Sequence, residues 1–170
     1  MWLSYLMSIR GYEIIQPFTV SSSGTIWQAT TKTGEACLIR FVLKDEADSR
    51  AERLETLSRL NSPFVARLID VVPDGARVGL VTSLVEGMPL NQWMQLPGAN
   101  TQNRVRALLR SIALGLKDLH EVGLAHGDVS SANVVVGSAG AVLVDHLLGT
   151  GFTPGFVAPE NLEGQQGTDP

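Results

Sequence analysis

Three oxygen-bearing side chains stand out in the second half of the chain: Asp128, Asn133 and Asp145. Asp128 closes the tripeptide His126-Gly127-Asp128, and Asn133 follows five positions later. A carboxylate can accept the proton of an attacking hydroxyl group, whereas an amide oxygen and a second carboxylate are ligands that suit Mg²⁺. The spacing therefore predicts phosphoryl transfer from a nucleotide. A turn-capping role would explain Asp128 or Asn133 singly, but not the pair together with Asp145.

A β-hairpin is expected to bring Asn133 and Asp145 together. Two Val-rich runs flank the turn Gly137-Ser138-Ala139-Gly140, a pattern typical of paired strands. Upstream, residues 100–120 carry apolar side chains at helical spacing, which predicts a long helix ended by Gly123. Its apolar stripe comprises Val105, Leu108, Leu109, Ile112, Ala113, Leu116 and Leu119, whereas its solvated face carries Arg104, Arg106 and Arg110.

The first half of the chain is dominated by strand patterns. One charged helix is expected at 48–60, and the strands are expected at 12–15, 25–30, 36–43, 65–72 and 77–84. In the strand at 36–43, alternation puts Cys37 and Ile39 on one face and Leu38 and Arg40 on the other. These elements predict an α+β fold, with a five-stranded antiparallel sheet and one helix before a mainly helical part.

The motifs together resemble those of the eukaryotic-like Ser/Thr protein kinase family. The run 126–133 stands where that family has H-R-D-x-x-x-x-N, and Asp145-His146-Leu147 stands at D-F-G. The run 155–160 matches the segment that ends in A-P-E. The resemblance covers about 12–160. It implies a kinase-like small lobe at 11–85 and a truncated large lobe at 86–170, with the catalytic loop and the activation segment.

The same resemblance implies ATP and Mg²⁺ as cofactors and assigns roles to single residues. Asp128 and Asn133 stand at the catalytic positions, and Asn133 and Asp145 stand at the metal positions. The nucleotide positions correspond to Gly24, Ile26, Leu38, Arg40, Thr82 and Val135.

The family motifs that bind the nucleotide phosphates are only partly present in this chain. Of the glycine loop only Gly24 survives, and Arg40 replaces the lysine that pairs with the phosphates. Leu38 replaces the alanine that lies against adenine, an overpacking cost of about 1–3 kcal/mol. Counting back from Pro63 puts Arg53 where the family has its helix glutamate. We therefore expect ATP and Mg²⁺ to bind weakly or not at all.

The catalytic half also departs from the family. Gly127 replaces the loop arginine and Ser130 replaces the loop lysine. Losing the arginine removes the usual partner of a phosphorylated activation segment, in which Thr150 and Thr153 are the only hydroxyls before Glu160. No phosphorylation switch is therefore expected.

Three functions remain open from the sequence. The first is a pseudokinase or weakly active kinase that acts in binding or regulation, and the second is an active ATP-dependent Ser/Thr protein kinase. The third is a small-molecule phosphotransferase, which the tripeptide His126-Gly127-Asp128 favours and the segment 155–160 opposes. Because the chain ends ten residues after Glu160, we expect a degenerate, C-terminally truncated kinase domain.

Composition narrows the partners and the compartment. A net charge of −4 gives no general attraction to nucleic acid or to acidic membranes. The single cysteine, Cys37, allows no internal disulfide, and the apolar run 1–7 is too short for a membrane helix. We expect a cytoplasmic protein with a protein substrate or a regulatory partner. Further helices or a partner would be needed to cover the apolar face of the helix at 100–120.

Overall fold

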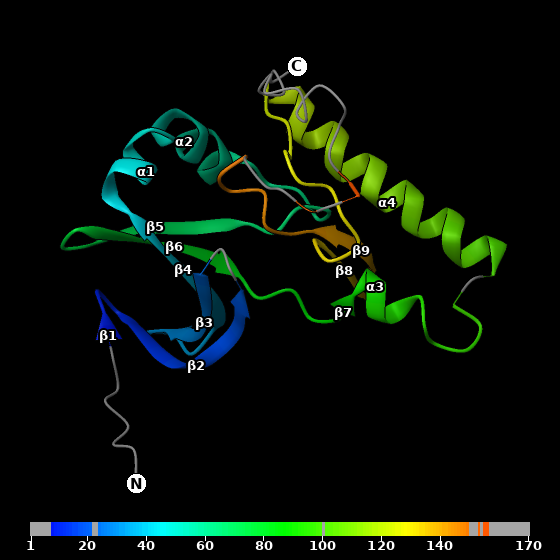
Figure 1. Ribbon diagram of the computed structural model, residues 1–170, viewed down its shortest axis with the longest axis horizontal. Coiled ribbons are helices and arrows are strands. Elements are labelled where there is room, and N and C mark those ends of the chain that lie inside the picture. Colours follow the sequence, from blue (N-terminus) through cyan, green and yellow to red (C-terminus); the bar gives the residue numbers. More distant parts are fainter. Residues whose placement is uncertain (1–7, 22–23, 100, 150–152, 154, 157–170) are drawn as a thin grey trace, which may run out of the picture. The chain divides into compact units, whose positions relative to one another are not determined.

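The computed structural model describes residues 8–21, 24–99, 101–149, 153 and 155–156 (Figure 1). The chain divides into two compact units. The first unit comprises the residues up to 58 together with 67–84, and the second comprises 59–66 together with the residues from 85 onward. The chain thus leaves the first unit, enters the second for eight residues, and returns.

The first unit is built on an antiparallel sheet with the strand order β1-β2-β3-β4-β6-β5. Five of these strands are the predicted ones, and a two-residue strand, β1, extends the edge. The strands are β1 (Ser8–Ile9), β2 (Tyr12–Ser21), β3 (Gly24–Thr31), β4 (Ala36–Leu43), β5 (Leu68–Asp74) and β6 (Arg77–Ser83).

One hydrophobic cluster of the first unit lies on the face of this sheet that carries Cys37 and Ile39, and Leu80 is fully buried on the opposite face. Cys37 and Ile39 of β4 are fully buried, as the predicted alternation requires, whereas Leu38 and Arg40 are half-buried on the other face. Apolar side chains of the five other strands complete the cluster, with Trp27 and Phe41 packed against it. Its buried members are Ile9, Tyr12, Ile14, Ala29, Cys37, Ile39, Val72 and Val81.

The helix predicted at 48–60 is α2 (Ala51–Arg59), and a short helix that the sequence did not predict, α1 (Lys44–Asp48), precedes it. The Ser49 hydroxyl donates to the Glu46 carbonyl (2.7 Å), and the Arg50 amide donates to the Ala47 carbonyl (3.0 Å). These short-range bonds tighten the chain and end α1, a competition with helix bonding that serine favours. On α2, Arg53 is buried beside Leu54 and Leu57, whereas the two glutamates, Glu52 and Glu55, are exposed.

The second unit combines a small sheet with the longest helix of the chain (Figure 1). The sheet has the order β7-β8-β9, and α4 packs against β9. Its β8–β9 pair is the predicted hairpin, in the register Val134↔Leu143. The elements are β7 (Met88–Pro89), α3 (Leu90–Trp93), α4 (Gln102–Glu121), β8 (Val134–Gly137) and β9 (Gly140–Leu143).

The predicted strand at 65–72 starts too early, because its first residues pair elsewhere. The Leu143 amide donates to the Phe64 carbonyl and the Ala66 amide donates to the Leu143 carbonyl, both at 2.8 Å. Residues 64–66 thus run beside β9 in the second unit, with Val65 bridged to Leu143 in parallel. The strand β5 then begins at Leu68 in the first unit.

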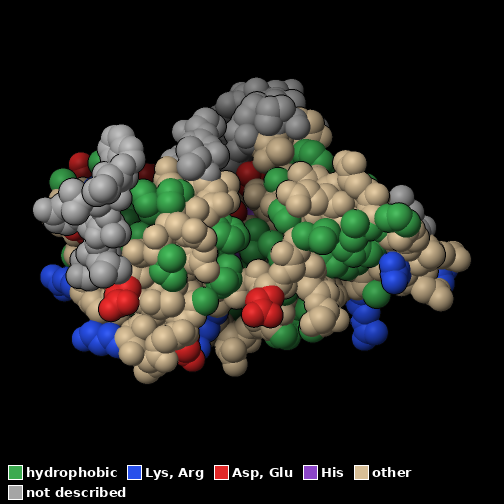
Figure 2. Space-filling model, turned by 90° about the horizontal axis from the view of Figure 1, so that it is seen from below, with side chains coloured by type: hydrophobic (Ala, Val, Ile, Leu, Met, Phe, Trp, Pro, Cys, Tyr) green, Lys and Arg blue, Asp and Glu red, His purple; other side chains and the backbone are tan. Residues whose placement is uncertain are grey.

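The packed face of α4 is rotated from the predicted stripe. Its buried residues include Ser111 and Gly115, whereas Val105 and Leu109 of the predicted stripe are 36% and 60% exposed. A Cβ atom on Gly115 would lie 2.8 Å from the Phe64 carbonyl oxygen, so the missing side chain allows close approach of the 64–66 segment. Val105 and Leu109 therefore stay at the surface. Figure 2 shows that hydrophobic side chains also reach the surface on one face of the molecule.

Candidate functional site

The loop that joins α4 to β8 carries two of the predicted catalytic residues, Asp128 and Asn133. The buried side chain of His126 fixes the backbone of this loop. The His126 ring is 2% exposed. Its Nδ1 accepts a hydrogen bond from the Asp128 amide (3.3 Å), and its Nε2 lies 3.0 Å from the Val144 carbonyl oxygen. Because an amide can only donate, Nδ1 is unprotonated and Nε2 carries the proton that it donates to Val144. A neutral histidine thus ties the backbone of Asp128 to the end of β9.

The Asp128 carboxylate is half-buried and already hydrogen-bonded. Its Oδ2 accepts from Asn133 Nδ2 (2.9 Å) and from Thr153 Oγ1 (3.0 Å). Asn133 Nδ2 also donates to the Asp128 carbonyl oxygen (2.9 Å). Both bonds of Asn133 use its amide nitrogen, so its carbonyl oxygen, on the other side of the amide group, points away from Asp128. The structure thus joins two predicted site residues with a third, Thr153.

Asp145 follows β9 in a conformation that is uncommon for a residue with a side chain. Its φ is 62°, in the left-handed region, which costs roughly 1–2 kcal/mol. The Val144 amide donates to the Asn133 carbonyl (3.0 Å), so the backbone before Asp145 is tied to Asn133. Backbone held in this way at a cost is common at functional sites.

The side-chain oxygens of Asn133 and Asp145 are of the kind that Mg²⁺ prefers. Within the described ranges no group of three or more His, Cys, Asp or Glu side chains could hold a metal ion. Mg²⁺ usually takes one or two carboxylates and completes its shell with phosphate oxygens and water. One amide oxygen and one carboxylate therefore suit a magnesium ion that arrives with a nucleotide.

Two further polar side chains lie buried around this loop. His146, at the position of the family's phenylalanine, is 1% exposed, and its ring centroid lies 6.0 Å from that of His126. Ser130 is 3% exposed, and its Oγ has no hydrogen-bond partner among the described residues. A short buried hydroxyl cannot replace the positive charge of the family's lysine.

Gly127 has a packing reason that the sequence did not reveal. Its φ is +85°, and a Cβ atom there would lie 2.1 Å from the Gly149 carbonyl oxygen. The chain after β9 thus passes directly over Gly127, and no side chain fits between them. This packing requires glycine whatever the substrate, so the tripeptide His126-Gly127-Asp128 is no longer an argument for a small-molecule phosphotransferase.

Four of the predicted nucleotide residues lie on one face of the first unit's sheet. Ile26 is paired with Arg40, and Leu38 is paired with Thr82. Residues opposite each other in antiparallel strands share a face, as do alternate residues of one strand, and all four side chains are half-buried. Gly24 begins β3 opposite Ser21, and the neighbouring positions 22 and 23 lie outside the described residues.

Two residues of the second unit remain: Val135, which was predicted to contact the nucleotide, and Thr153, which was not predicted as a site residue. Val135, on β8 of the second unit, is half-buried and paired with Pro89 and Val142. Sequence reasoning missed the contact of Thr153 with Asp128, because it joins residues 25 positions apart through the return of the chain. Thr150 and the predicted A-P-E residues 158–160 lie outside the described residues.

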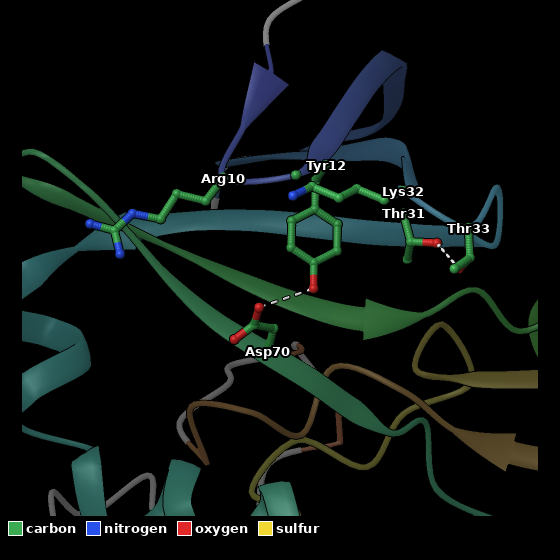
Figure 3. A pocket seen from close by; sticks show the side chains of 7 residues that line it. Arg10, Tyr12, Thr31, Lys32, Thr33 and Asp70 are labelled. Carbon is green, nitrogen blue, oxygen red and sulfur yellow. Dashed lines mark hydrogen bonds between the residues drawn. The ribbon is translucent and has the colours of Figure 1, made fainter.

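A polar pocket of about 260 Å³ opens elsewhere, in the first unit (Figure 3). The Tyr12 hydroxyl donates to Asp70 Oδ2 (3.0 Å), which joins β2 to β5. Burial, with help from the hydrogen bond and the charge of Asp70, raises the pKa of Tyr12 to about 12. None of the predicted site residues lines this pocket, whose lining is Arg10, Gly11, Tyr12, Thr31, Lys32, Thr33 and Asp70.

The fold and the loop geometry define a kinase-type domain, and comparison with known proteins gives its family. The model of the protein kinase domain family matches residues 20–170. The chain therefore belongs to the protein kinase family, as the motifs predicted.

Curated relatives are Ser/Thr protein kinases and related enzymes. The serine/threonine-protein kinase PkaA of Streptomyces coelicolor is 28% identical, over 92% of this chain and 35% of that protein. Mitogen-activated protein kinase kinase 7 of Arabidopsis thaliana is 30% identical, over 72% of this chain and 41% of that protein. The chain thus spans about a third to two fifths of these relatives.

Solved structures confirm the α+β kinase fold. A point mutant of the kinase domain of Mycobacterium tuberculosis PknI matches with a TM-score of 0.80 and 22% identity, over 99% of this chain and 71% of that one. Rad53 in complex with AMP-PNP matches with a TM-score of 0.79 and 24% identity, over 91% and 43%. Among the described residues, no helix is long and apolar enough to cross a membrane.

Proposed function

We propose that this chain is a weakly active protein kinase domain, which transfers the γ-phosphoryl group of ATP to Ser or Thr hydroxyls. The observation that carries the proposal is the hydrogen bond of Asp128 Oδ2 with a threonine hydroxyl at 3.0 Å. A general base must lie within about 2.6–3.2 Å of the oxygen whose proton it takes. Asp128 meets this condition, and His126 and Asn133 hold it in place.

Each retained residue has a distinct role in the proposal. Asp128 accepts the proton of the acceptor hydroxyl, and Asn133 keeps the carboxylate oriented through its amide nitrogen. The carbonyl oxygen of Asn133 and the carboxylate of Asp145 would hold magnesium, which neutralises negative charge on the transferring phosphoryl group. The backbone of Asp145 lies in the left-handed region, and the preceding Val144 amide is bonded to the Asn133 carbonyl.

The nucleotide side explains why the activity is proposed to be weak. Leu38 and Arg40 share a face of the first unit's sheet with Ile26 and Thr82, the face assigned to the nucleotide. Leu38 is larger than the family's alanine and leaves less space for adenine. The Arg40 side chain is longer than lysine and its charge is spread over a planar fork. Arg53 is on the inward face of α2, where the family has a glutamate. These changes favour a second candidate, a pseudokinase that binds a regulatory partner without transfer.

Nucleotide binding should be weak and dependent on metal. The ligands at Asn133 and Asp145 are kept but the phosphate anchors are not, so phosphate charge must be balanced by the metal. We expect no thermal shift with ATP alone and a small one with ATP and Mg²⁺ or Mn²⁺, measured by differential scanning fluorimetry. Micromolar binding of ATP without metal would contradict the assignment of the site, and no binding under any condition would favour the pseudokinase.

Leu38→Ala should strengthen nucleotide binding. If Leu38 crowds the adenine position, its removal relieves an overpacking cost of about 1 kcal/mol or more, which corresponds to an affinity gain of about fivefold. Isothermal titration with ATP and Mg²⁺ measures the change. Leu43→Ala is the matched control, because Leu43 ends the same strand and is 64% exposed. Equal or weaker binding by Leu38→Ala would show that position 38 does not face the nucleotide.

A further inference from the structure

The polar pocket of the first unit lies where two turns of its sheet meet. Tyr12 of β2 is paired with Thr31 of β3, so the turn before β2 and the turn after β3 lie side by side. The pocket between them has a volume of about 260 Å³. Drug-sized ligands occupy roughly 300–1,000 Å³, so this pocket suits a small polar group. None of the residues proposed for phosphoryl transfer lines it, so a ligand here is independent of the proposed function.

The turn before β2 has an uncommon backbone that makes room for Lys32. Arg10 has a φ of 39°, in the left-handed region, which is unfavourable for a residue with a Cβ atom. Gly11 follows with a φ of +101°, and a Cβ atom there would lie 2.6 Å from Lys32 Cε. Lys32 is thus folded across this turn. Unfavourable backbone of this kind is common where ligands are held.

Two cations of the pocket, Arg10 and Lys32, form no ion pair with any residue that the structure describes. Figure 3 shows Lys32 above the ring of Tyr12, whereas Arg10 extends outward. Arg10 is exposed, so its side chain can turn toward an anion without breaking an ion pair. Both cations are therefore available to a negatively charged ligand.

The carboxylate of Asp70 does not cancel this positive charge. Its Oδ2 accepts a hydrogen bond from the Tyr12 hydroxyl (3.0 Å), and its Oδ1 accepts one from the Val71 amide (2.8 Å). Burial, with help from Asp70, raises the pKa of Tyr12 to about 12, so the phenol adds no negative charge at neutral pH. Two cations and one carboxylate give the lining a net positive charge, although the whole chain has a net charge of −4.

The turn after β3 adds a hydroxyl donor. Thr31 Oγ1 and Thr33 Oγ1 lie 2.8 Å apart, and the Glu35 amide donates to Thr31 Oγ1 (3.1 Å). The Thr33 hydroxyl also donates to Glu35 Oε2, but at 3.5 Å this bond is long and weak. An oxyanion in the pocket would compete for the same donor.

We propose that this pocket binds a phosphate group, held by Lys32, Arg10 and the hydroxyl of Thr33. Arginine presents paired N–H groups that match phosphate oxygens, and lysine binds them as a point charge. A phosphate group offers several oxygen acceptors to these donors. Inorganic phosphate and a phosphorylated side chain of another protein present the same oxygens, so both fit the lining.

The test is an NMR titration of the full ¹⁵N-labelled chain, at constant ionic strength and without ATP or magnesium. Its three probes are inorganic phosphate, a phosphoserine peptide and the same peptide without phosphate. We expect saturable shifts of the backbone amides at 10–12 and 31–35 with both phosphate sources, and none with the unmodified peptide. Lys32→Gln should weaken phosphate binding by about tenfold or more, because it removes a charged donor.

Lys117→Gln is the matched control, since this exposed lysine pairs with Glu121 in the second unit. It removes the same charge and should leave phosphate binding unchanged. Arg10→Gln, a change on the other turn, should weaken binding as Lys32→Gln does, and it replaces that variant if Lys32→Gln lowers the melting temperature.

The affinities of the two phosphate sources identify the ligand. Tighter binding of the phosphopeptide points to a phosphorylated protein, and equal or weaker binding points to the free anion. The proposal is overturned if the shifts do not saturate or if the unmodified peptide causes them too. Equal phosphate binding by Lys32→Gln and Lys117→Gln overturns it as well.

Discussion

Asp128→Asn is expected to lower phosphoryl transfer to an added basic protein by about 10²–10⁴-fold, with the fold unchanged. The asparagine side chain has the same shape, and its oxygen can still accept the hydrogen bonds of Asn133 and Thr153. It cannot accept the proton of an acceptor hydroxyl as a carboxylate does. The loss should therefore appear in the transfer rate and leave the thermal melting temperature almost unchanged.

Glu121→Gln is the matched control for this variant. Glu121 is an exposed residue of α4 that pairs with Lys117, so the change removes the same unit of charge from the second unit. We expect wild-type transfer from this control. Transfer that survives in Asp128→Asn would show that the measured activity comes from another group or from a contaminating kinase, and Asp128 would lose its proposed role.

Gly127→Ala is expected to destabilise the chain by about 2–5 kcal/mol. The left-handed backbone of Gly127 costs a residue with a Cβ atom about 1–2 kcal/mol. The new methyl group would also meet the Gly149 carbonyl at 2.1 Å, and relief of such overpacking usually costs about 1–3 kcal/mol more. Because the obstacle is backbone, the segment after β9 must move as a whole. Urea unfolding followed by fluorescence measures the loss.

Gly123→Ala separates the two contributions. Gly123 has a similar φ of +77°, but no atom lies within 4 Å of the place where its Cβ atom would be. This variant should lose only the backbone part, about 1–2 kcal/mol. Equal losses in the two variants would show that the Gly149 segment does not lie against Gly127.

The parts of the fold that follow local patterns were predictable. The alternation in β4 predicted the burial of Cys37 and Ile39, and the two Val-rich runs predicted the β8–β9 hairpin. The predictions were wrong where the packing of an element depends on a segment that is distant in the sequence. The face of α4 that packs includes Gly115, because the 64–66 segment lies against this residue. The apolar periodicity within α4 contains no information about this distant segment.

The candidate site, like the fold, was predictable where its residues are close together in the sequence. Asp128, Asn133 and Asp145 follow from spacing, because a short loop and a hairpin hold them. Thr153 and the reason for Gly127 were not predictable, since both depend on the return of the chain across the loop after β9. The short helix α1 was not predicted, and a bond from the Ser49 side chain to a backbone carbonyl helps to end it, which helix periodicity does not record.

Residues 59–66 belong to the second unit although they precede the last two strands of the first. This arrangement determines which residues a separately expressed second unit must contain. A gene fragment beginning at Val85 would encode α4 and the β8–β9 hairpin, but not Phe64 and Ala66, which pair with the amide and the carbonyl of Leu143. Leu143 is fully buried, so that fragment would leave one edge of β9 without its covering segment. A separately expressed second unit therefore has to carry residues 59–66 as well, joined to Val85 by an artificial linker in place of the strands β5 and β6.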